Sequence, residues 1–404
     1  MDGGRSVPDG ARGGVRSSEV GAQSADADGS LPAEADERFM ARAVELARRG
    51  AGWTSPNPLV GAVIVRDGRI IGEGWHHRFG GPHAEREALA ACSESPAGAT
   101  AYVTLEPCCH TGKTPPCTEA LIEAGIARVV VGVLDPNPLV AGRGNEALRR
   151  AGIEVAVGVL EPSCRAVNEP FRHAMEQRRP LVIAKYAMTL DGKVATREGL
   201  SRWVTGEAAR RRVHEDRHRH AGVMVGIGTA LADDPLLTCR LDGREVSQPA
   251  RVVVDAAARL SLESQLVRTA SEAPVIVAVA EGALLARRNA LAERGCAVVA
   301  VPAREGRVDP RILMELLWQR FSLDSLIVEG GPTLLGSLFD EGLVDRVQAY
   351  IAPKIFGGLE ALGPVAGRGV GDPADAPVLS EVSLQMMGGD VLLEGRLQPC
   401  SPVS

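Results

Sequence analysis

The sequence predicts two α/β domains in one chain, a three-layer α/β/α sandwich followed by a second α/β domain with its own sheet. The chain has 404 residues, which is too long for one ordinary hydrophobic core, because a domain usually holds about 100–200 residues. Strand patterns also alternate with helical patterns in two separate series, as expected for sheets covered by helices. Hydrophobic residues make up 45% of the chain, which is enough to fill two such cores.

The first domain is expected over residues 36–160. Asp36 is the expected N-cap of a helix over 36–49. Asp67-Gly68, between two apolar runs, predicts a β-hairpin. Strands are expected at 60–65, 69–74, 101–105, 128–134 and 153–160, and helices at 83–92, 116–124 and 145–151.

The rest of the chain divides into a tail, a linker and the second domain. Residues 1–35 carry almost no large apolar side chains, so we expect a disordered tail. Residues 161–180 are expected to form a linker that includes a helix, and residues 181–400 the second domain. There, strands are expected near 181–186, 221–225, 250–254, 275–279, 297–301 and 325–328, with helices at 283–294 and 310–321.

Charge and composition exclude several classes of function. The formal net charge is −6 and only 3% of residues are aromatic, which argues against nucleic-acid binding. No apolar run is long enough to cross a membrane, and no secretory signal precedes the first helix. We therefore expect a cytoplasmic protein that binds neither nucleic acid nor membrane. A small phosphorylated molecule as partner and assembly as a homo-oligomer are further expectations that do not follow from composition. In a reducing compartment, clustered cysteines indicate metal ligands before disulfides.

The strongest chemical signal is His83-Ala84-Glu85 followed by Pro107-Cys108 and Cys117. One imidazole and two thiolates suit zinc, and three protein ligands leave a fourth position for a water whose pKa zinc lowers to about 7. Glu85 opens a predicted helix, where its carboxylate can act as a proton shuttle. Hydrolytic removal of an exocyclic amine requires this combination of groups.

Two further features of the cysteines bear on this site. Both Cys108 and Cys117 stand beside helix-start signals, and helix N-termini favour thiolate over thiol. An alternative is a closed structural zinc site with Cys109 or His110 as fourth ligand. Glu85 argues against it, because a structural site has no use for that carboxylate.

In the second half, a glycine turn predicts an anion site. An apolar strand at 326–328 is followed by Gly330-Gly331, and Pro332 then opens a helix. Two glycines let the backbone approach a ligand, and the free N–H groups of a helix start bind phosphate. The usual dinucleotide fingerprint is absent, because Gly226-Ile227-Gly228 lacks its third glycine.

Several motifs resemble the family of bifunctional riboflavin biosynthesis proteins, in which a deaminase precedes a reductase. Eight residues separate Cys108 from Cys117, as in this family, whereas general nucleoside deaminases usually have two. The matching segments are 54–61, 81–85 and 106–117 for the deaminase half, and 185–193, 201–206, 228–235 and 328–333 for the reductase half.

The resemblance implies a cytidine-deaminase-like first domain and a second domain similar to dihydrofolate reductase. It implies zinc-dependent deamination of 2,5-diamino-6-ribosylamino-4(3H)-pyrimidinone 5′-phosphate. NADPH-dependent reduction of the ribosyl group to a ribityl chain would follow. Two alternatives stay open: a general nucleoside or base deaminase fused to a non-catalytic nucleotide-binding module, and a non-catalytic zinc-and-nucleotide binding protein.

The resemblance also assigns residues, carried over position by position. In the first site it places zinc on His83, Cys108 and Cys117, the proton donor at Glu85, and substrate contacts at Asn57, His76, Lys113, Asp135 and Asn137. In the second it places the nicotinamide nucleotide on Ala187, Trp203, Thr229, Asp233, Gly331, Pro332, Thr333, Leu334 and Leu335, and substrate on Ser201, Arg217, Leu236, Arg240 and Glu329. Glu329 and Lys185 are the candidate catalytic groups of this site. Arg217 and Arg240 suit a phosphate, which a guanidinium binds bidentately, and Lys185 is either a proton donor or an ordinary strand-edge lysine.

Overall fold

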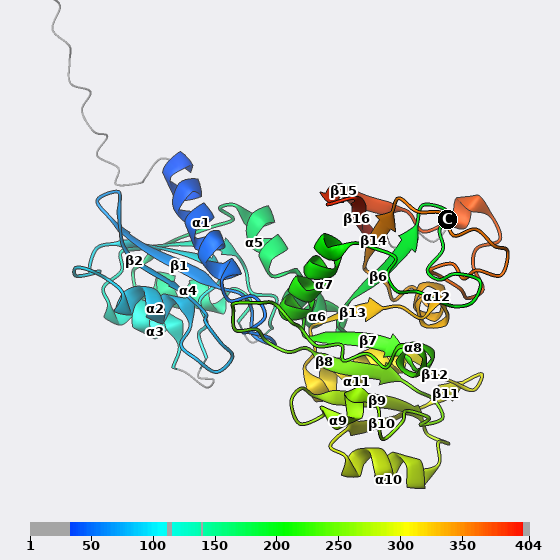
Figure 1. Ribbon diagram of the computed structural model, residues 1–404. Helices are drawn as coiled ribbons and strands as arrows, with labels where there is room; N and C mark the ends of the chain where they lie inside the picture. The colour runs from blue at the N-terminus through cyan, green and yellow to red at the C-terminus, as the bar shows by residue number, and fades with distance from the viewer. Residues whose placement is uncertain (1–32, 111–114, 139, 399–404) are drawn as a thin grey trace, which may run out of the picture.

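The computed structural model describes residues 33–110, 115–138 and 140–398, which form two α/β units joined by short helices (Figure 1). In the first unit the strand order is β2-β1-β3-β4-β5. Its strands are β1 (Gly61–Arg66), β2 (Arg69–Trp75), β3 (Thr100–Leu105), β4 (Arg128–Val133) and β5 (Glu154–Val157). Its helices are α1 (Ala33–Arg48), α2 (Ala84–Ala90), α3 (Cys117–Glu123) and α4 (Arg143–Arg150).

Helices cover both faces of the first sheet. α2, α3 and α4 contribute Ala88, Leu121 and Leu148 to the buried cluster on one face, while α1 contributes Phe39 and Met40 to the cluster on the other. The three-layer sandwich expected for this unit is thereby confirmed. The hairpin is confirmed as well, since β1 and β2 pair up to the turn at Asp67-Gly68, where φ is 49° and 70°, as a type I′ turn requires.

The expected start of the first helix is wrong. α1 begins at Ala33, so residues 33–35 belong to a helix and not to a tail; residues 1–32 lie outside the described part. Asp36 is therefore inside the helix and caps nothing. Its carboxylate is buried, accepting a hydrogen bond from Tyr102 Oη at 2.7 Å and two from the Arg128 guanidinium at 2.9 and 2.8 Å.

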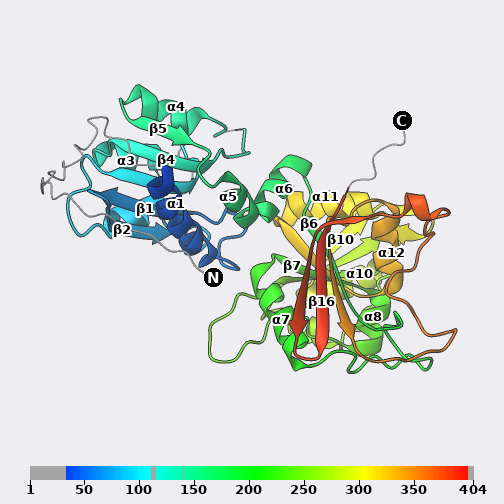
Figure 2. The same ribbon diagram turned by 90° about the horizontal axis from the view of Figure 1, so that it is seen from above.

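The segment expected as a linker folds into two consecutive helices, α5 (Glu161–Val167) and α6 (Glu169–Gln177), which lie between the units (Figure 2). Cys164 and Phe171 join an apolar cluster of the first unit. Glu169 accepts a hydrogen bond from Arg346 Nε at 3.0 Å and forms an ion pair with Arg396, both in the second unit. The connection is thus a packed bridge.

The second unit has a nine-stranded sheet in the order β10-β9-β8-β7-β13-β6-β14-β16-β15. Its strands are β6 (Leu181–Thr189), β7 (Gly222–Gly226), β8 (Ala250–Val254), β9 (Val275–Ala280), β10 (Ala297–Val301), β13 (Ser325–Glu329), β14 (Arg346–Ala352), β15 (Leu379–Met387) and β16 (Asp390–Leu397). β11 (Ala303–Arg304) and β12 (Arg307–Val308) form a separate two-stranded sheet. Its helices are α7 (Glu207–Arg219), α8 (Ile227–Asp233), α9 (Gln265–Arg268), α10 (Leu285–Glu293), α11 (Pro310–Phe321) and α12 (Pro332–Asp340), besides a 3-10 turn at Pro373–Asp375.

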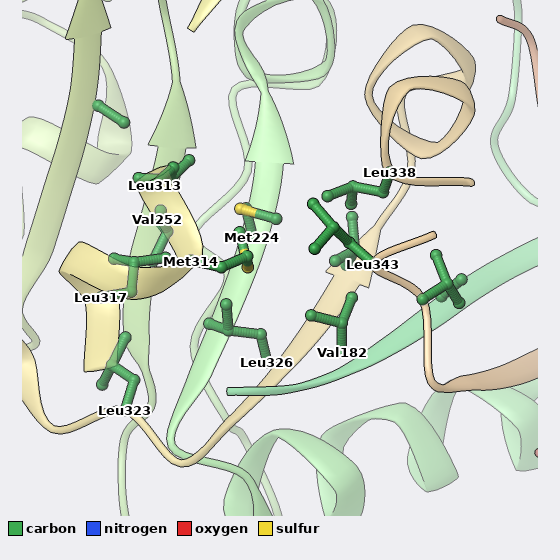
Figure 3. Close-up of a cluster of buried hydrophobic side chains, with 14 of the residues drawn as sticks. Val182, Met224, Val252, Leu313, Met314, Leu317, Leu323, Leu326, Leu338 and Leu343 are labelled. Atoms are coloured by element: carbon green, nitrogen blue, oxygen red, sulfur yellow. The ribbon is translucent and has the colours of Figure 1, made fainter. Parts of the chain in front are cut away.

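All six strands expected in this unit are present, but β14, β15 and β16 were not foreseen. The sheet is parallel from β10 to β14, and β16 and β15 then extend it antiparallel. Its largest core lies where α11 and α12 pack on the strands, and Met224, Leu313 and Leu338 belong to this one buried cluster (Figure 3). Among the described residues, no helix combines the length and apolarity needed to cross a bilayer.

We expect Asp36→Ala to destabilise the first unit by about 3 kcal/mol, because it leaves the largely buried Arg128 guanidinium without its main partner. Hydrogen exchange of the β3 and β4 amides would measure this separately from the second unit. Glu154→Ala is the matched control, since Glu154 also pairs with Arg128 but its side chain is 64% exposed, and its loss costs about 1 kcal/mol or less. Equal effects of the two substitutions would contradict the assigned role of Asp36.

Candidate active sites

The three predicted zinc ligands meet where two helices begin beside the end of β3. His83 is the N-cap of α2, Cys117 is the first residue of α3, and Cys108 lies in the loop after β3. Their ligand atoms all lie within 4.8 Å of one another. His83 Nδ1 is 3.5 Å from Cys108 Sγ and 3.3 Å from Cys117 Sγ. One nitrogen and two sulfurs at this spacing fit zinc.

The expectation that Cys108 stands beside a helix start of its own is not met, because residues 106–110 are in no helix. The N-terminus of α3 contacts its sulfur instead, because the backbone N–H of Cys117 donates a hydrogen bond to Cys108 Sγ at 3.3 Å. A hydrogen bond from the Cys117 thiol and the nearby His83 lower the pKa of Cys108 to about 4, against the effect of burial. A thiolate is therefore favoured at Cys108.

Glu85 lies two residues after His83, in the first turn of α2, and its side chain is buried. Burial, together with the negative charge of Cys108, raises the pKa of Glu85 to about 7. A carboxyl group of this kind both accepts and releases protons near neutral pH. Within the described residues, neither Cys109 nor His110 belongs to the ligand cluster, so the closed four-ligand alternative finds no support there.

Asn57 and His76 are hydrogen-bonded to each other beside this cluster. His76 Nδ1 is 2.8 Å from the carbonyl oxygen of Pro82, and Nε2 is 3.1 Å from Asn57 Nδ2. Burial lowers the pKa of His76, so the ring is neutral, with Nδ1–H donating to Pro82 and Nε2 accepting from Asn57. This fixes the Asn57 amide so that its Oδ1 can accept a hydrogen bond from a ligand.

Asp135 and Asn137 follow the end of β4. The Asn137 backbone N–H donates to Asp135 Oδ1 at 2.8 Å, and burial raises the pKa of Asp135 to about 6. Lys113, the remaining contact expected in this site, lies outside the described residues.

Glu106 has a function in this site that the sequence did not reveal. Its buried carboxylate accepts hydrogen bonds from the backbone N–H groups of Asp135, Gly142 and Asn145, at 3.3, 2.9 and 3.1 Å. A Cβ on Gly144 would lie 2.1 Å from the carbonyl oxygen of Pro107, so the two segments are in close contact. Glu106 thus holds the segment that carries Asp135. The position of Glu106 directly before Pro107-Cys108 is the feature of the sequence that could have indicated this role.

A large cavity in the second unit brings most of the remaining predicted residues together. It measures about 1360 Å³ and opens at the ends of β7, β8 and β13. Four predicted residues, Trp203, Arg217, Leu236 and Arg240, do not line it. Those that line it are Lys185, Ala187, Ser201, Thr229, Asp233, Glu329, Gly331, Pro332, Thr333, Leu334 and Leu335.

Lys185 and Glu329 form the charged centre of this cavity. They are paired in register on β6 and β13, with Lys185 Nζ 3.8 Å from Glu329 Oε2. Arg217 binds the same carboxylate through Nε at 2.6 Å and Nη2 at 2.8 Å. Burial would raise the pKa of Glu329, but Arg217 and Lys185 outweigh it and bring the value to about 2. Burial lowers the pKa of Lys185, opposed by the charge of Glu329.

The two predicted phosphate-binding arginines differ in their surroundings. The guanidinium of Arg217 is largely buried and engaged by Glu329 and by the carbonyl oxygen of Thr238, at 3.0 Å. Arg240 is exposed, and its Nη1 donates to Thr238 Oγ1 at 2.9 Å. Arg240 is therefore the better placed of the two to meet a phosphate.

Trp203 and Leu236 are held by other contacts. The Trp203 ring is 64% exposed, with the Arg210 guanidinium 4.6 Å from its centroid. The carbonyl oxygen of Leu236 accepts a hydrogen bond from the buried Arg251 at 3.2 Å. Neither contact brings these residues to the cavity wall.

Comparison with known proteins identifies the family. The family model described as RibD C-terminal domain matches residues 180–393, and that of the cytidine and deoxycytidylate deaminase zinc-binding region matches residues 33–133. The riboflavin biosynthesis protein RibD of Actinobacillus pleuropneumoniae is 47% identical over 359 residues, covering 89% of this chain and 94% of that protein. The chain belongs to the RibD family.

Other RibD proteins agree in sequence and in structure. RibD of Escherichia coli K12 is 41% identical over 372 residues, which cover 89% of this chain and 98% of that protein. Form 1 of Acinetobacter baumannii RibD superposes with a TM-score of 0.83 at 36% identity, covering 91% of this chain and 100% of that one. A Thermotoga maritima structure, described as a diaminohydroxyphosphoribosylaminopyrimidine deaminase/5-amino-6-(5-phosphoribosylamino)uracil reductase, gives 0.80 at 40% identity, covering 91% and 99%.

Membership of the RibD family settles the fold class and the general activity. The first unit is a cytidine-deaminase-like domain and the second a RibD reductase domain. The chain is a bifunctional deaminase and reductase of riboflavin biosynthesis, with zinc and NADPH as cofactors.

In this RibD-family deaminase domain, we expect Cys117→Ser to lower the zinc content of the purified protein sharply, because a neutral hydroxyl replaces a thiolate ligand. Cys109→Ser is the matched control and should keep full zinc occupancy, since Cys109 is outside the cluster. Elemental analysis by mass spectrometry measures both. Zinc loss in the Cys109 variant alone would transfer the ligand role to Cys109.

We expect Glu85→Gln to retain zinc but to lose deamination by roughly 10² or more, because the amide has nearly the same shape but cannot carry protons. Ammonia release from the diamino substrate measures the rate, and metal analysis of the same sample checks the site. Near-normal turnover would show that another group moves the protons.

Proposed function

We propose that the first site deaminates 2,5-diamino-6-ribosylamino-4(3H)-pyrimidinone 5′-phosphate and that the second reduces the ribosyl group of the product to a ribityl chain. The observation that carries this proposal is the joining, in one chain, of a buried carboxyl beside three zinc-ligand side chains with a cavity centred on Lys185 and Glu329. The description of the Thermotoga maritima protein supports the same pair of reactions.

For the deamination, His83, Cys108 and Cys117 hold zinc, which supplies an activated water when bound. Glu85 accepts a proton from the attacking water and passes a proton to the departing amine. Asn57 and Asp135 orient the pyrimidine, the first held by His76 and the second by the hydrogen bonds of its segment to Glu106. Because Glu85 is buried beside the ligands, the proton path is short and shielded from bulk solvent.

For the reduction, NADPH would supply a hydride to C1′ of the ring-opened imine when bound. The electron pair of the C=N bond would move to nitrogen, which needs a proton donor. Lys185 is the proposed donor, because burial lowers its pKa and so makes its ammonium group a better acid. Glu329, fixed by Arg217, positions the Lys185 side chain.

We propose in addition a cytoplasmic homo-oligomer that binds neither nucleic acid nor membrane. A row of exposed apolar side chains, Val382, Leu384 and Met386, lies along the edge strand β15, and an exposed apolar edge favours pairing with another chain. The net charge of −6 and the 3% aromatic content disfavour nucleic acid.

One experiment separates this function from its alternatives. The protein is incubated with the diamino substrate, with and without NADPH, and the masses of the products are measured by mass spectrometry. Loss of the amine without NADPH, followed by a two-hydrogen gain when NADPH is added, supports both steps. Deamination without any NADPH oxidation favours a deaminase fused to a non-catalytic nucleotide-binding module, and no turnover at all favours a binding protein.

We expect Arg240→Ala to raise the KM of the reductase substrate by roughly 10-fold or more, because a charged hydrogen bond to the 5′-phosphate is lost. The KM for NADPH should not change. Arg244→Ala, four residues further along the chain, is the matched control and should leave both constants unaltered. Steady-state kinetics with the deaminated intermediate measures them, and an unchanged substrate KM in the Arg240 variant would remove this residue from the site.

A further inference from the structure

The cavity of the reductase domain continues well past the proposed reaction centre. β6, β13, β7 and β8 are consecutive neighbours in the sheet and run parallel. Residues that follow these strands line the cavity: Lys185, the Gly330-Gly331 turn, Gly228, and then Ala256, Ala257 and Arg259 after β8. A dinucleotide with its nicotinamide at Lys185 and its phosphates at Gly331 would extend its adenosine ribose toward the loop after β8.

The acid that follows β8 is turned away from this ribose position. In dinucleotide-binding domains of the Rossmann type, an acid binds the 2′-hydroxyl of NADH, whereas an arginine accommodates the 2′-phosphate of NADPH. The same chemistry distinguishes the two nucleotides at a ribose site in another fold. Asp255 is completely buried and does not line the cavity. Its Oδ2 accepts a hydrogen bond from the Leu260 backbone N–H at 2.7 Å, so it closes its own loop and is not presented to a ligand.

Arg259 is the residue that this loop presents to the cavity. Its side chain is 59% exposed, with Nε 3.9 Å from the buried Asp255 Oδ1. Arg287 holds the loop from behind, donating to the carbonyl oxygens of Ala258 at 3.0 Å and Leu260 at 2.8 Å. The backbone that carries Arg259 is thus fixed, while its guanidinium remains accessible.

The hairpin of β11 and β12 brings two more arginines to the wall of the same cavity. Arg304 is 58% exposed but binds Glu341 at 3.2 Å, so its charge is already compensated. Arg307 lines the cavity as well and adds positive charge there. A doubly charged phosphate suits this positive charge, and Arg259 is the arginine that the loop after β8 contributes to the cavity.

We propose that Arg259 binds the 2′-phosphate of the adenosine ribose and thereby selects NADPH over NADH. The proposal rests on the proposed reductase function, because it places the nucleotide in the same cavity. It assigns the preference to one side chain, whose loop lacks an available acid for the ribose hydroxyls of NADH.

The test measures, by isothermal titration calorimetry, how the full-length protein binds two half-molecules, namely the adenosine parts of NADPH (2′,5′-ADP) and of NADH (5′-AMP). We expect 2′,5′-ADP to bind the unaltered protein about 10-fold or more tightly than 5′-AMP, since only the former carries the extra phosphate. Arg259→Gln should abolish this preference and Arg259→Lys should keep part of it. Arg304→Gln is the matched control, equally exposed on the same cavity, and should keep the preference. Circular dichroism verifies folding of each variant.

Kinetics gives a second readout. In Arg259→Gln, we expect kcat/KM for NADPH to fall to the level of NADH, with the NADH value unchanged. The assignment is overturned if Arg259→Gln still prefers 2′,5′-ADP, or if only Arg304→Gln or Arg307→Gln loses the preference. Failure of the proposed reductase function has a different result, because the unaltered protein would then bind neither half-molecule and oxidise no NADPH.

Discussion

Neighbouring parallel strands end at the same edge of a sheet, and both sites of this chain depend on that constraint. In the first unit, Glu106 and Cys108 follow β3 and Asp135 follows the adjacent β4. In the second, the Gly330-Gly331 turn follows β13, two strands from the loop after β8. Open α/β sheets generally bind ligands outside the carboxyl ends of their strands. The parallel arrangement of the strands is therefore enough to bring side chains that are far apart in sequence to one edge of the sheet.

Each site is completed by ionic and polar contacts between elements that the sheets bring together. Glu329 is fixed by Arg217 from α7 and faces Lys185 on the neighbouring strand, which places a largely buried ion pair in the wall of the cavity. In the first unit, side chains around His83, Cys108 and Cys117 hold one another through hydrogen bonds, as the partly buried Asn57 and the buried His76 do. Preorganised groups of this kind need little rearrangement when a substrate binds.

Local patterns explain which features could be predicted from the sequence. Asp67-Gly68 encodes its hairpin within four residues, and His83, Cys108 and Cys117 are recognisable because few other residue types bind zinc. Asp36 was misjudged because its partner Arg128 lies 92 residues away, and a carboxylate near a helix start is usually a cap. The partner of Arg217, Glu329, is likewise 112 residues distant, so the sequence alone could not show that this guanidinium is already engaged. β15 is exposed along most of its length, so it lacks the apolar pattern of a buried strand. It pairs with β16 across a turn at Gly388-Gly389, and this glycine pair was a hairpin signal in the sequence.

The carboxylate of Glu106 joins two segments of the deaminase domain, one that carries Cys108 and one that carries Asp135. It stands two residues before Cys108 and accepts hydrogen bonds from the segment that contains Asp135. Whatever orders one segment therefore reduces the conformational entropy that the other loses on binding. Coupling between two binding equilibria is reciprocal. A zinc ion held by Cys108 would then strengthen the binding of a pyrimidine beside Asp135, and the pyrimidine would raise the affinity for zinc by the same factor.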